Sequence, residues 1–404
     1  MPAPAPPLPV ADTRRPLRGA VLVLLMGCVV LAGCAARPDV GALKVSDQPA
    51  AGATEHTILI ATTRARADAP DTYFSGERGK RRDFARATIS VPPAHKPGRV
   101  EWPSVLPGDP SRHFVAREAG YLDDGDSFRR AVNAALADRP AHERDVFVFI
   151  HGYNTLFAEG LYRFAQVVHD SGFTGVPVLF TWASRGNVTD YVYDLNSATV
   201  ARDALEHTLA ELMRSDARRI HIMAHSMGTW LLMETARQIP SGDLTRSADR
   251  IGQVVLAAPD IDIDVFKAQM RRIGKPPRPY MILLSKDDRA LSLSSRIAGG
   301  KARVGGYEND RELAELGAVV VDLTDLDGPD ATNHTKFTAI GAIAPQLQSV
   351  LAAQGLDPGE AQPATGLADA GRDLGSFVRS TAQIAVTLPV TLLTIPVALA
   401  GAAE

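Results

Sequence analysis

Residues 219–228 read Arg-Ile-His-Ile-Met-Ala-His-Ser-Met-Gly, and this stretch decides the fold. Its apolar first half is typical of a short buried strand, and it leads directly to Ser226. Ala224 and Gly228 are small, which relieves crowding where a strand turns sharply into a helix. Residues 229–239 then have the composition of a buried helix. The stretch therefore predicts a strand, a tight turn and a helix, with a serine hydroxyl exposed at the turn.

A serine at such a turn is a candidate nucleophile. The usual spacing is Gly-x-Ser-x-Gly, and Ala224 replaces the first glycine here, so the match is to a looser, small-residue form. Backbone amides at the start of the following helix would favour negative charge that develops beside Ser226. The alternative is an ordinary turn or helix-capping serine. The presence of partner residues in a fixed order along the chain favours the nucleophile.

The composition is that of an ordinary globular protein. Of 404 residues, 45% are hydrophobic and 22% are charged, which suits one main domain with additions. The net charge of -3 and the lack of long basic runs argue against nucleic acid as a partner, and the small basic cluster at 78–82 is read as solvated surface. Both cysteines, Cys28 and Cys34, lie near the N-terminus. The predicted domain therefore has no disulfide, cysteine metal site or nucleophilic cysteine.

The N-terminal segment predicts export. Arginines precede the apolar run 20–32, which is short for a membrane-spanning helix, so residues 1–33 are read as a signal peptide. The run ends in Leu-Ala-Gly followed by Cys34, which resembles a bacterial lipobox and predicts that Cys34 carries a lipid. Ala35, in place of Asp, favours delivery to the outer membrane of the cell envelope, facing the periplasm. A plain signal peptide or a short signal anchor is the alternative interpretation.

Composition also divides the rest of the chain. Residues 34–55 are rich in Ala, Pro and Gly and predict a flexible tether. Residues 56–350 form the main domain, and 351–404 a linker with an apolar C-terminal tail. The tail at 384–403 is long enough to cross a bilayer, but its two prolines and three threonines count against a spanning helix. The sequence leaves open whether this tail associates with a membrane or packs on the protein.

The main domain alternates apolar strands with amphipathic helices. Continuous apolar strands are typical of parallel sheets that are buried on both faces. The alternation predicts right-handed crossovers and an α/β fold, with a mostly parallel central sheet and helices on both faces. Strands are expected at 56–63, 85–91, 145–150, 176–181, immediately before Ser226, and at 253–257, 280–285 and 318–322; helices are expected at 128–137, 157–168, 201–213 and 229–239.

A nucleophilic serine needs an imidazole that takes its proton and an acid that holds the imidazole in the correct tautomer. At this kind of turn the acid and then the histidine follow the serine along the chain. Of the 10 histidines only His334 lies beyond Ser226, so His334 is the predicted base. Asp288, which follows an apolar strand and leads into a helix, is the preferred acid. Asp287 and Asp260 are the alternatives.

The oxyanion hole needs two preorganised backbone amides. Met227, directly after the serine, is expected to supply one, and Tyr153, in the glycine-containing loop after an early strand, the other. Asn154 could brace that loop. The loop after the next strand lies at the carboxyl edge of the sheet, where ligands bind in such folds. The candidate pocket residues are therefore Asn154, Trp182, Ser184, Tyr191 and Asp194, with ordinary packing as the alternative for Trp182 and Tyr191.

Five motifs carry a resemblance to a known family: His-Gly-Tyr-Asn at 151–154, Ala-His-Ser-Met-Gly at 224–228, Ala-Pro-Asp at 258–260, Asp-Asp-Arg-Ala-Leu at 287–291 and Asn-His at 333–334. Together they resemble the α/β-hydrolase superfamily, and more narrowly a bacterial family of exported or lipid-anchored esterase- or lipase-like hydrolases of unassigned function. The resemblance extends over roughly residues 56–347. It implies the α/β-hydrolase fold and a Ser-His-Asp hydrolase with no metal or organic cofactor, and it implies no particular substrate.

The leading hypothesis is a carboxylic ester hydrolase that forms an acyl-enzyme on Ser226. Lipid anchoring makes small-molecule or lipid esters near a membrane reasonable substrates, with the lipid on Cys34 and the apolar tail as candidate membrane contacts. A thioesterase, an amidase or an acyltransferase would use the same residues. The rival from another class is a non-catalytic envelope protein that keeps the fold as an interaction scaffold. Intact serine, histidine and acid residues weigh against that rival.

Overall fold

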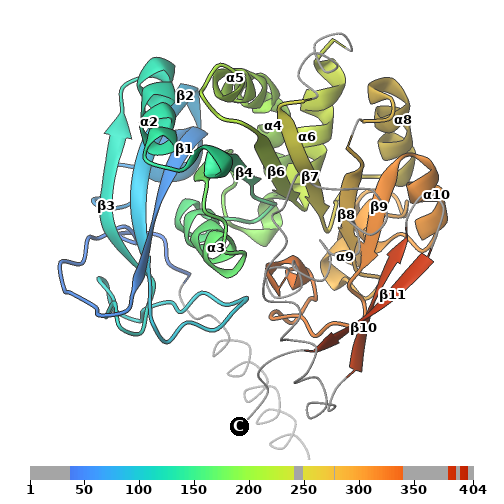
Figure 1. The fold of residues 1–404 in the computed structure, drawn as a ribbon. Helices are drawn as coiled ribbons and strands as arrows, with labels where there is room; N and C mark the ends of the chain where they lie inside the picture. Colours follow the sequence, from blue (N-terminus) through green and yellow to red (C-terminus); the bar gives the residue numbers. More distant parts are fainter. Residues whose placement is uncertain (1–36, 241–248, 277, 340–380, 388–391, 399–404) are drawn as a thin grey trace, which may run out of the picture. The chain divides into compact units, whose positions relative to one another are not determined.

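The computed structural model describes residues 37–240, 249–276, 278–339, 381–387 and 392–398 (Figure 1). For the last two ranges it describes the backbone and, of the side chains, only that of Val386. The predicted signal peptide over 1–33, the predicted lipid attachment at Cys34 and the predicted linker over 351–380 lie outside the described residues.

The described strands form one 11-stranded sheet in the order β11-β10-β9-β8-β7-β6-β4-β5-β1-β2-β3. All the strand pairs between β9 and β1 in this order are parallel. The strands at the two ends pair antiparallel. The prediction of an α/β fold with a mostly parallel sheet is therefore confirmed. The strands are β1 (Thr54–Arg66), β2 (Phe74–Val91), β3 (Val115–Leu122), β4 (Val146–Ile150), β5 (Val176–Thr181), β6 (Ile220–His225), β7 (Ile251–Ala257), β8 (Tyr280–Leu284), β9 (Ala318–Asp322), β10 (Thr381–Thr387) and β11 (Leu392–Ala398).

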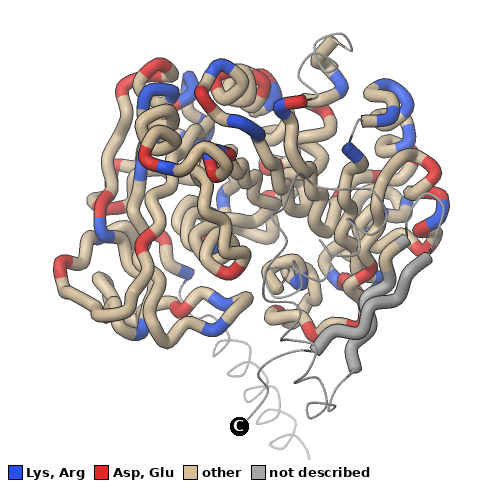
Figure 2. Tube along the Cα trace, viewed as in Figure 1, with Lys and Arg blue, Asp and Glu red and all other residues tan. Residues whose placement is uncertain are grey.

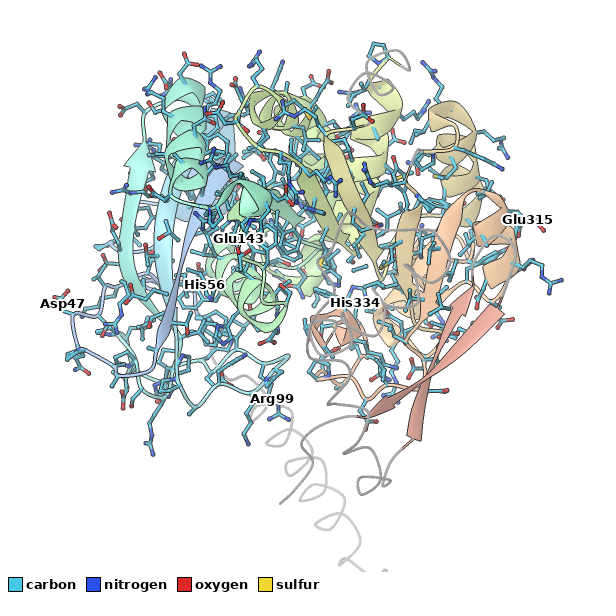
Figure 3. All side chains as sticks on the ribbon, in the orientation of Figure 1. Asp47, His56, Arg99, Glu143, Glu315 and His334 are labelled. Atoms are coloured by element: carbon cyan, nitrogen blue, oxygen red, sulfur yellow. The ribbon has the colours of Figure 1, made fainter. Side chains whose placement is uncertain are left out.

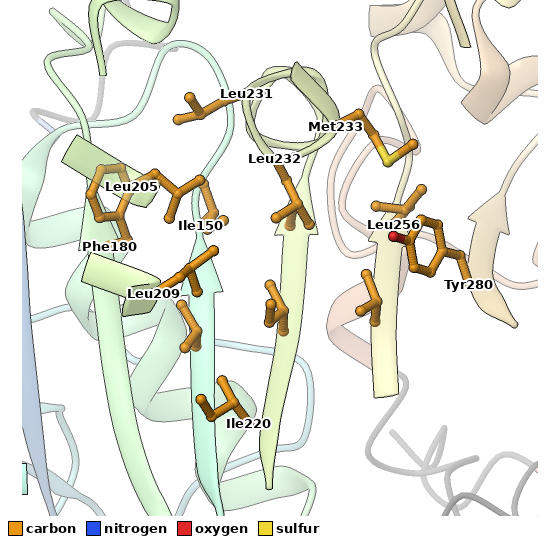
Figure 4. Packing of buried hydrophobic residues seen from close by; sticks show 14 of the residues in the cluster. Ile150, Phe180, Leu205, Leu209, Ile220, Leu231, Leu232, Met233, Leu256 and Tyr280 are labelled. Atoms are coloured by element: carbon orange, nitrogen blue, oxygen red, sulfur yellow. The ribbon is translucent and has the colours of Figure 1, made fainter. Parts of the chain in front are cut away.

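Helices cover both faces of the sheet because the central strands are apolar on both sides. In β4, Val148 and Ile150 belong to one core cluster, whereas Phe147 and Phe149 belong to the other, as the alternation of side chains along a strand requires. Helix α3 (Phe157–Asp170) covers the phenylalanine side. Figure 4 shows leucines of α5 (Arg202–Met213) and α6 (Met227–Gln238) packed on the opposite side.

The α-helices are α2 (Gly125–Ala137), α3 (Phe157–Asp170), α4 (Tyr191–Val200), α5 (Arg202–Met213), α6 (Met227–Gln238), α8 (Ile263–Ile273), α9 (Arg289–Ile297) and α10 (Asp310–Glu315). Short 3-10 helices are η1 (Ala141–Glu143), η2 (Val188–Asp190), η3 (Val304–Gly306) and η4 (Lys336–Ala339). Charged residues of both signs lie along the outer helices and loops, while the central strands carry few (Figure 2).

The segment predicted as a flexible tether differs from that prediction in its second half. Ala42 and Leu43 are buried in the core. Tyr162 of α3 donates its hydroxyl to the Ala42 carbonyl (2.8 Å), and the amide of Ser46 donates to the carbonyl of Ala116 in β3 (2.9 Å). Ala42 and Leu43 therefore pack within the folded domain. The composition of the segment alone does not predict this packing. Strand β3 itself was not predicted.

The described part of the apolar tail lies on the protein. Strand β10 pairs antiparallel with β9 and with β11, so the two strands extend the sheet at the edge opposite β3. Val386 of β10 is fully buried and belongs to the same core cluster as Val321 of β9. Among the residues that the structure describes, none of the helices has the length and apolar character needed to span a membrane.

Candidate active site

Ser226 stands at the turn between β6 and α6, in a backbone conformation that residues other than glycine rarely adopt (φ 53°, ψ -124°). Such a conformation costs roughly 1–3 kcal/mol and persists only where the surroundings hold it. The amide of Ser226 donates to the carbonyl of Ala257 (2.9 Å), and its carbonyl accepts from the amides of Thr229 (3.0 Å) and Asp260 (3.3 Å). The predicted strand, tight turn and helix are all present, but the predicted exposure of the serine is wrong, because Ser226 is only 3% exposed.

Two glycines allow this turn to approach the end of β4. A Cβ atom at Gly152 would lie 2.7 Å from Ser226 Cβ and 2.9 Å from His225 Nδ1. A Cβ atom at Gly228 would lie 2.4 Å from the carbonyl oxygen of His151. These distances are too short for any side chain, so glycine is required at both positions. The loop after β4 consequently lies directly against the serine.

His334 lies on the loop after β9 (Figure 3) and pairs with Asp288. His334 Nδ1 donates to Asp288 Oδ2 over 2.6 Å. Asp288 is only 2% exposed and is the N-cap of α9, where its Oδ1 accepts from the amide of Leu291 (2.9 Å). The His334 ring lies 4.7 Å, centroid to centroid, from that of His225, and His225 Nε2 donates to the His334 carbonyl (3.3 Å). Because His225 precedes Ser226, the histidine loop meets the serine turn.

Asp287, one alternative acid, has other partners. Lys336 Nζ lies 2.8 Å from one of its oxygens, and Asn333 Nδ2 donates to the other over 2.7 Å. The hydroxyl of Ser285 also donates to Asp287. This aspartate therefore holds the histidine loop to the end of β8 and does not contact the imidazole of His334.

Asp260, the other alternative acid, belongs to a separate buried cluster. Ser294 Oγ donates to it over 2.6 Å, the hydroxyl of Tyr191 over 3.2 Å, and Arg303 Nε lies 3.2 Å from the same oxygen that Ser294 binds. The amide of Asp260 also binds the carbonyl of Ser226. Asp260 thus supports the serine turn through its backbone.

The pKa values of the three histidines near the turn diverge. Burial alone would lower the pKa of His334, but the hydrogen bond and charge of Asp288 outweigh it and raise the pKa above its ordinary value of 6.5. Burial and the Arg64 charge lower the pKa of His151 to about 3. Burial and His334 hold the pKa of His225 well below its usual range. His334 is thus the strongest base of the three.

Across the described residues, no group of three or more His, Cys, Asp or Glu side chains could hold a metal ion.

The loop that carries His334 is organised by Asp330. One oxygen of Asp330 accepts from the amides of Thr332 (3.0 Å) and His334 (3.2 Å), and the other accepts from the amide of Thr335 (2.9 Å). These bonds and those of its neighbouring hydroxyls keep the pKa of Asp330 well below its usual range, although burial acts in the opposite direction. The carboxylate therefore remains charged and fixes the backbone on both sides of the histidine.

The loop after β4 is held by two side chains from the segment after β5. The amide of Asn154 donates to Asp194 Oδ2 (3.1 Å), and the amide of Thr155 donates to Ser184 Oγ (2.9 Å). Ser184 in turn donates to Asp194 over 2.5 Å. Asn154 has a positive φ of 56°, so these bonds also hold a costly backbone conformation.

The two amides predicted for the oxyanion hole remain candidates in this geometry. Tyr153 lies between Gly152 and the two anchored residues, and its amide is not one of those used to hold the loop. Met227 is the first residue of α6, and the first amides of a helix have no acceptor inside the helix. Both amides therefore lie on the two segments that meet at Ser226.

Trp182 packs against His151, at the start of the loop after β4. It is fully buried, its indole nitrogen donates to the carbonyl of His151 (3.0 Å), and its ring stacks on that of His151 at 5.0 Å. Packing, the alternative interpretation, describes Trp182 better than pocket lining. Tyr191 is partly buried, and its ring meets that of Tyr153 edge to face at 5.2 Å. These two tyrosines bring the start of α4 beside the loop after β4.

A buried arginine that sequence reasoning missed completes this support. Arg64 of β1 donates to Thr181 Oγ1 (2.8 Å) and to the carbonyls of Ser184 (2.7 Å) and Thr155 (2.7 Å). Burial lowers its pKa to about 10, despite the nearby Asp194 charge, so the guanidinium stays protonated at neutral pH. The only sequence signal is an arginine inside an apolar strand.

Comparisons with known proteins give one family match. A family model described as "Alpha/beta hydrolase of unknown function (DUF900)" matches residues 124–352. A search of curated proteins finds no significant match. Similar solved structures include a fungal esterase from Rhizomucor miehei, with 13% identity over 84% of this chain and 98% of that chain (TM-score 0.32). The carboxylesterase EstE1 from a metagenomic library shows 11% identity over 86% and 98% (TM-score 0.27), and a hyperthermophilic esterase from the archaeon Pyrobaculum calidifontis 13% over 83% and 98% (TM-score 0.28).

Proposed function

The chain belongs to the family of α/β hydrolases of unknown function (DUF900), whose model matches more than half of it, and from this premise we propose that it is a serine hydrolase that cleaves carboxylic esters. In this proposal Ser226 is the nucleophile, His334 the general base and Asp288 the acid of the triad. The amides of Met227 and Tyr153 form the oxyanion hole.

The observation that carries the proposal is the short bond between His334 and Asp288 beside the strained serine turn. A carboxylate on Nδ1 leaves Nε2 as the proton acceptor, and the raised pKa makes the imidazole a stronger base. Backbone strain at a serine is costly, and it is found where function requires it. Together these features suit a hydroxyl that must be deprotonated during attack.

The proposed reaction runs in two halves. Ser226 Oγ attacks the acyl carbon while its proton passes to His334 Nε2, and the carbonyl electrons move to the oxygen, which the two amides stabilise. The C–O bond then breaks, and His334 returns the proton to the departing alcohol, which leaves an acyl-enzyme. Water attacks the acyl carbon in the same way, and the acid is released.

Activity-based labelling tests this proposal. A fluorophosphonate probe should label the wild-type protein, and Ser226→Ala should abolish the labelling while leaving the melting temperature close to that of the wild type. Ser104→Ala, which removes the hydroxyl of an exposed serine outside the turn, is a matched control that keeps the nucleophile. A well-folded wild-type protein that is not labelled would favour the non-catalytic scaffold.

A panel of p-nitrophenyl esters from short to long acyl chains then defines the acyl preference. Matched thioesters and amides separate an esterase from a thioesterase or an amidase, and added alcohols reveal an acyltransferase, since all four reactions use the same groups. Hydrolysis that is confined to short chains would count against a true lipase.

Localisation is a separate part of the proposal. The lipobox-like sequence before Cys34 supports a lipid anchor in the bacterial cell envelope, probed by metabolic labelling with a fatty acid. Wild-type protein should incorporate the label and fractionate with the outer membrane, and Cys34→Ser should do neither. Incorporation that persists in Cys34→Ser would refute anchoring at this residue.

A further inference from the structure

A cavity of about 170 Å³ lies beside the candidate active site. Three of its lining residues are immediate neighbours of catalytic candidates: His225 precedes Ser226, Thr335 follows His334, and Gly152 lies against the serine side chain. A cavity of about 150 Å³ can bind a molecule of the size of benzene, so this one has room for a short acyl chain.

The walls of the cavity are largely aromatic, and their charged residues are Arg163 and Glu159. Trp102, Phe149 and Phe337 supply apolar surface, and Arg163 of α3 supplies a guanidinium. The hydrogen bonds of Arg163 to described residues both come from Nη1, which donates to the carbonyl of Gly98 (3.0 Å) and to Gln166 Oε1 (2.9 Å). Within the part of the chain that the structure describes, no hydrogen bond uses the edge formed by Nε and Nη2.

The acidic groups around Arg163 are bound elsewhere. Asp170 pairs with His95 (2.8 Å), and Glu101 pairs with the other nitrogen of the same ring (2.8 Å). Asp330 organises the histidine loop. Glu159, which also lines the cavity, accepts from the amide of Leu156 at the start of α3 (2.9 Å).

The charges of these carboxylates do not fully cancel the effect of burial on the pKa of the Arg163 guanidinium. Burial lowers the pKa of Arg163, although Asp170, Asp330, Glu159 and Glu101 all act to raise it. No ion pair joins Arg163 to another residue in the described part of the chain. A planar guanidinium edge with two parallel N–H groups matches a carboxylate in bidentate geometry.

We propose that the cavity binds a short acyl group that ends in a carboxylate, with that carboxylate on the Nε–Nη2 edge of Arg163. The proposal rests on the proposed function and narrows its substrate class to half-esters of short dicarboxylic acids. The acyl carbon would lie at Ser226, and hydrolysis would release an alcohol and the dicarboxylate. The aromatic walls would contact the methylene groups.

Two esters of matched length test the substrate class: mono-p-nitrophenyl adipate and p-nitrophenyl hexanoate, with rates corrected by Ser226→Ala. Wild-type kcat/KM should favour the adipate ester, and Arg163→Met should reduce the adipate-to-hexanoate ratio by about tenfold to a hundredfold, the range expected for a charged hydrogen-bonded pair. Arg163→Lys keeps the charge without the paired donors and should give an intermediate ratio. Equal ratios in the wild type and Arg163→Met would overturn the proposal.

Arg99→Met is the matched control. Arg99 (Figure 3) is exposed and lies next to Gly98, so its loss removes the same charge nearby without touching the cavity wall. Its ratio should equal that of the wild type. A drop as large as that of Arg163→Met would show a general electrostatic effect and refute a specific site.

Binding of adipate to Ser226→Ala, measured by calorimetry, tests the cavity independently of catalysis. Adipate should bind and hexanoate should bind more weakly, and the preference should disappear in the double variant that also carries Arg163→Met. If no ester is cleaved and no probe labels the protein but adipate still binds through Arg163, the proposed function fails and the site stands. If esters are cleaved and adipate does not bind, the site fails alone.

Discussion

At the scale of single residues, Ser226 combines the position of a nucleophile with a backbone cost. Its φ of 53° and ψ of -124° belong to a region that glycine alone enters freely. The three backbone hydrogen bonds that Ser226 makes to Ala257, Thr229 and Asp260 hold it there. The backbone conformation that places the serine at the turn therefore lowers the stability of the folded protein.

Replacing the serine separates these two effects. Ser226→Gly should be more stable than Ser226→Ala by about 1 kcal/mol. Glycine removes backbone strain of roughly 1–3 kcal/mol from the folded state, but its greater conformational freedom also stabilises the unfolded chain and cancels part of this gain. Urea unfolding with equal m values would measure the difference, and both variants should lack fluorophosphonate labelling. Equal stability of the two variants would contradict a strained turn.

The raised pKa of His334 predicts the pH dependence of activity. The base acts only when unprotonated, so kcat/KM should fall as the pH drops through a value above 6.5. Asp288→Asn removes the group that raises this pKa, so the acid limb should move to lower pH, and kcat should fall by about 10³- to 10⁴-fold. Asp327→Asn, at an exposed aspartate on the same loop as His334, is the matched control and should leave the acid limb in place. An acid limb that stays unmoved in Asp288→Asn would assign it to another group.

Sequence order was enough to propose His334, because it is the sole histidine after Ser226. Among the three aspartates the sequence favoured Asp288, which leads into a helix, and the structure places Asp288 against His334. The sequence left Asp287 open as an alternative, because the two residues are adjacent and differ only in the direction their side chains take. Arg64 was not predicted for a related reason. Several of its partners are backbone carbonyls of distant segments, such as those of Ser184 and Thr155, and the sequence does not indicate which carbonyls lie near an arginine.

At the scale of elements, strand prediction succeeded where both faces of a strand are buried. Strands β5 and β9 have the predicted bounds. Strand β3 was missed because it is an edge strand that carries Arg117, Glu118 and Gly120 among half-exposed positions. Strand β2 extends well before its predicted start, since its first half is polar. A continuous apolar sequence thus identifies the central strands of the sheet, but it does not identify the edge strand β3 or the polar first half of β2.

The close approach of α6 to β4 gives a prediction at this scale. Gly228→Ala should lower the free energy of unfolding by about 1–3 kcal/mol and slow probe labelling, because the added methyl group would meet the carbonyls of His151 and Ile150. Gly120→Ala is the matched control, as no atom lies within 4 Å of the position of its Cβ. Denaturant unfolding of both variants tests this. Equal stabilities would mean that the serine turn and β4 can move apart at little cost in free energy.

At the scale of the whole molecule, the C-terminal strands complete one edge of the sheet. Val386 of β10 is fully buried against β9, so Val386→Ala should cost about 1–2 kcal/mol of unfolding free energy. Val105, which is 75% exposed, provides the control Val105→Ala, with little change expected. A thermal melt of the two variants distinguishes them, and coincident melting curves would contradict the packing of β10.

This arrangement has a consequence for biosynthesis. The ribosome releases β9 well before residues 381–387 emerge, so the growing chain presents an unpaired β9 edge until its last strands arrive. During that interval the open edge is a template for pairing with another nascent chain. Chaperones would meet the same hazard in any product cut short before β10, and proteolytic quality control would be expected to remove such fragments quickly.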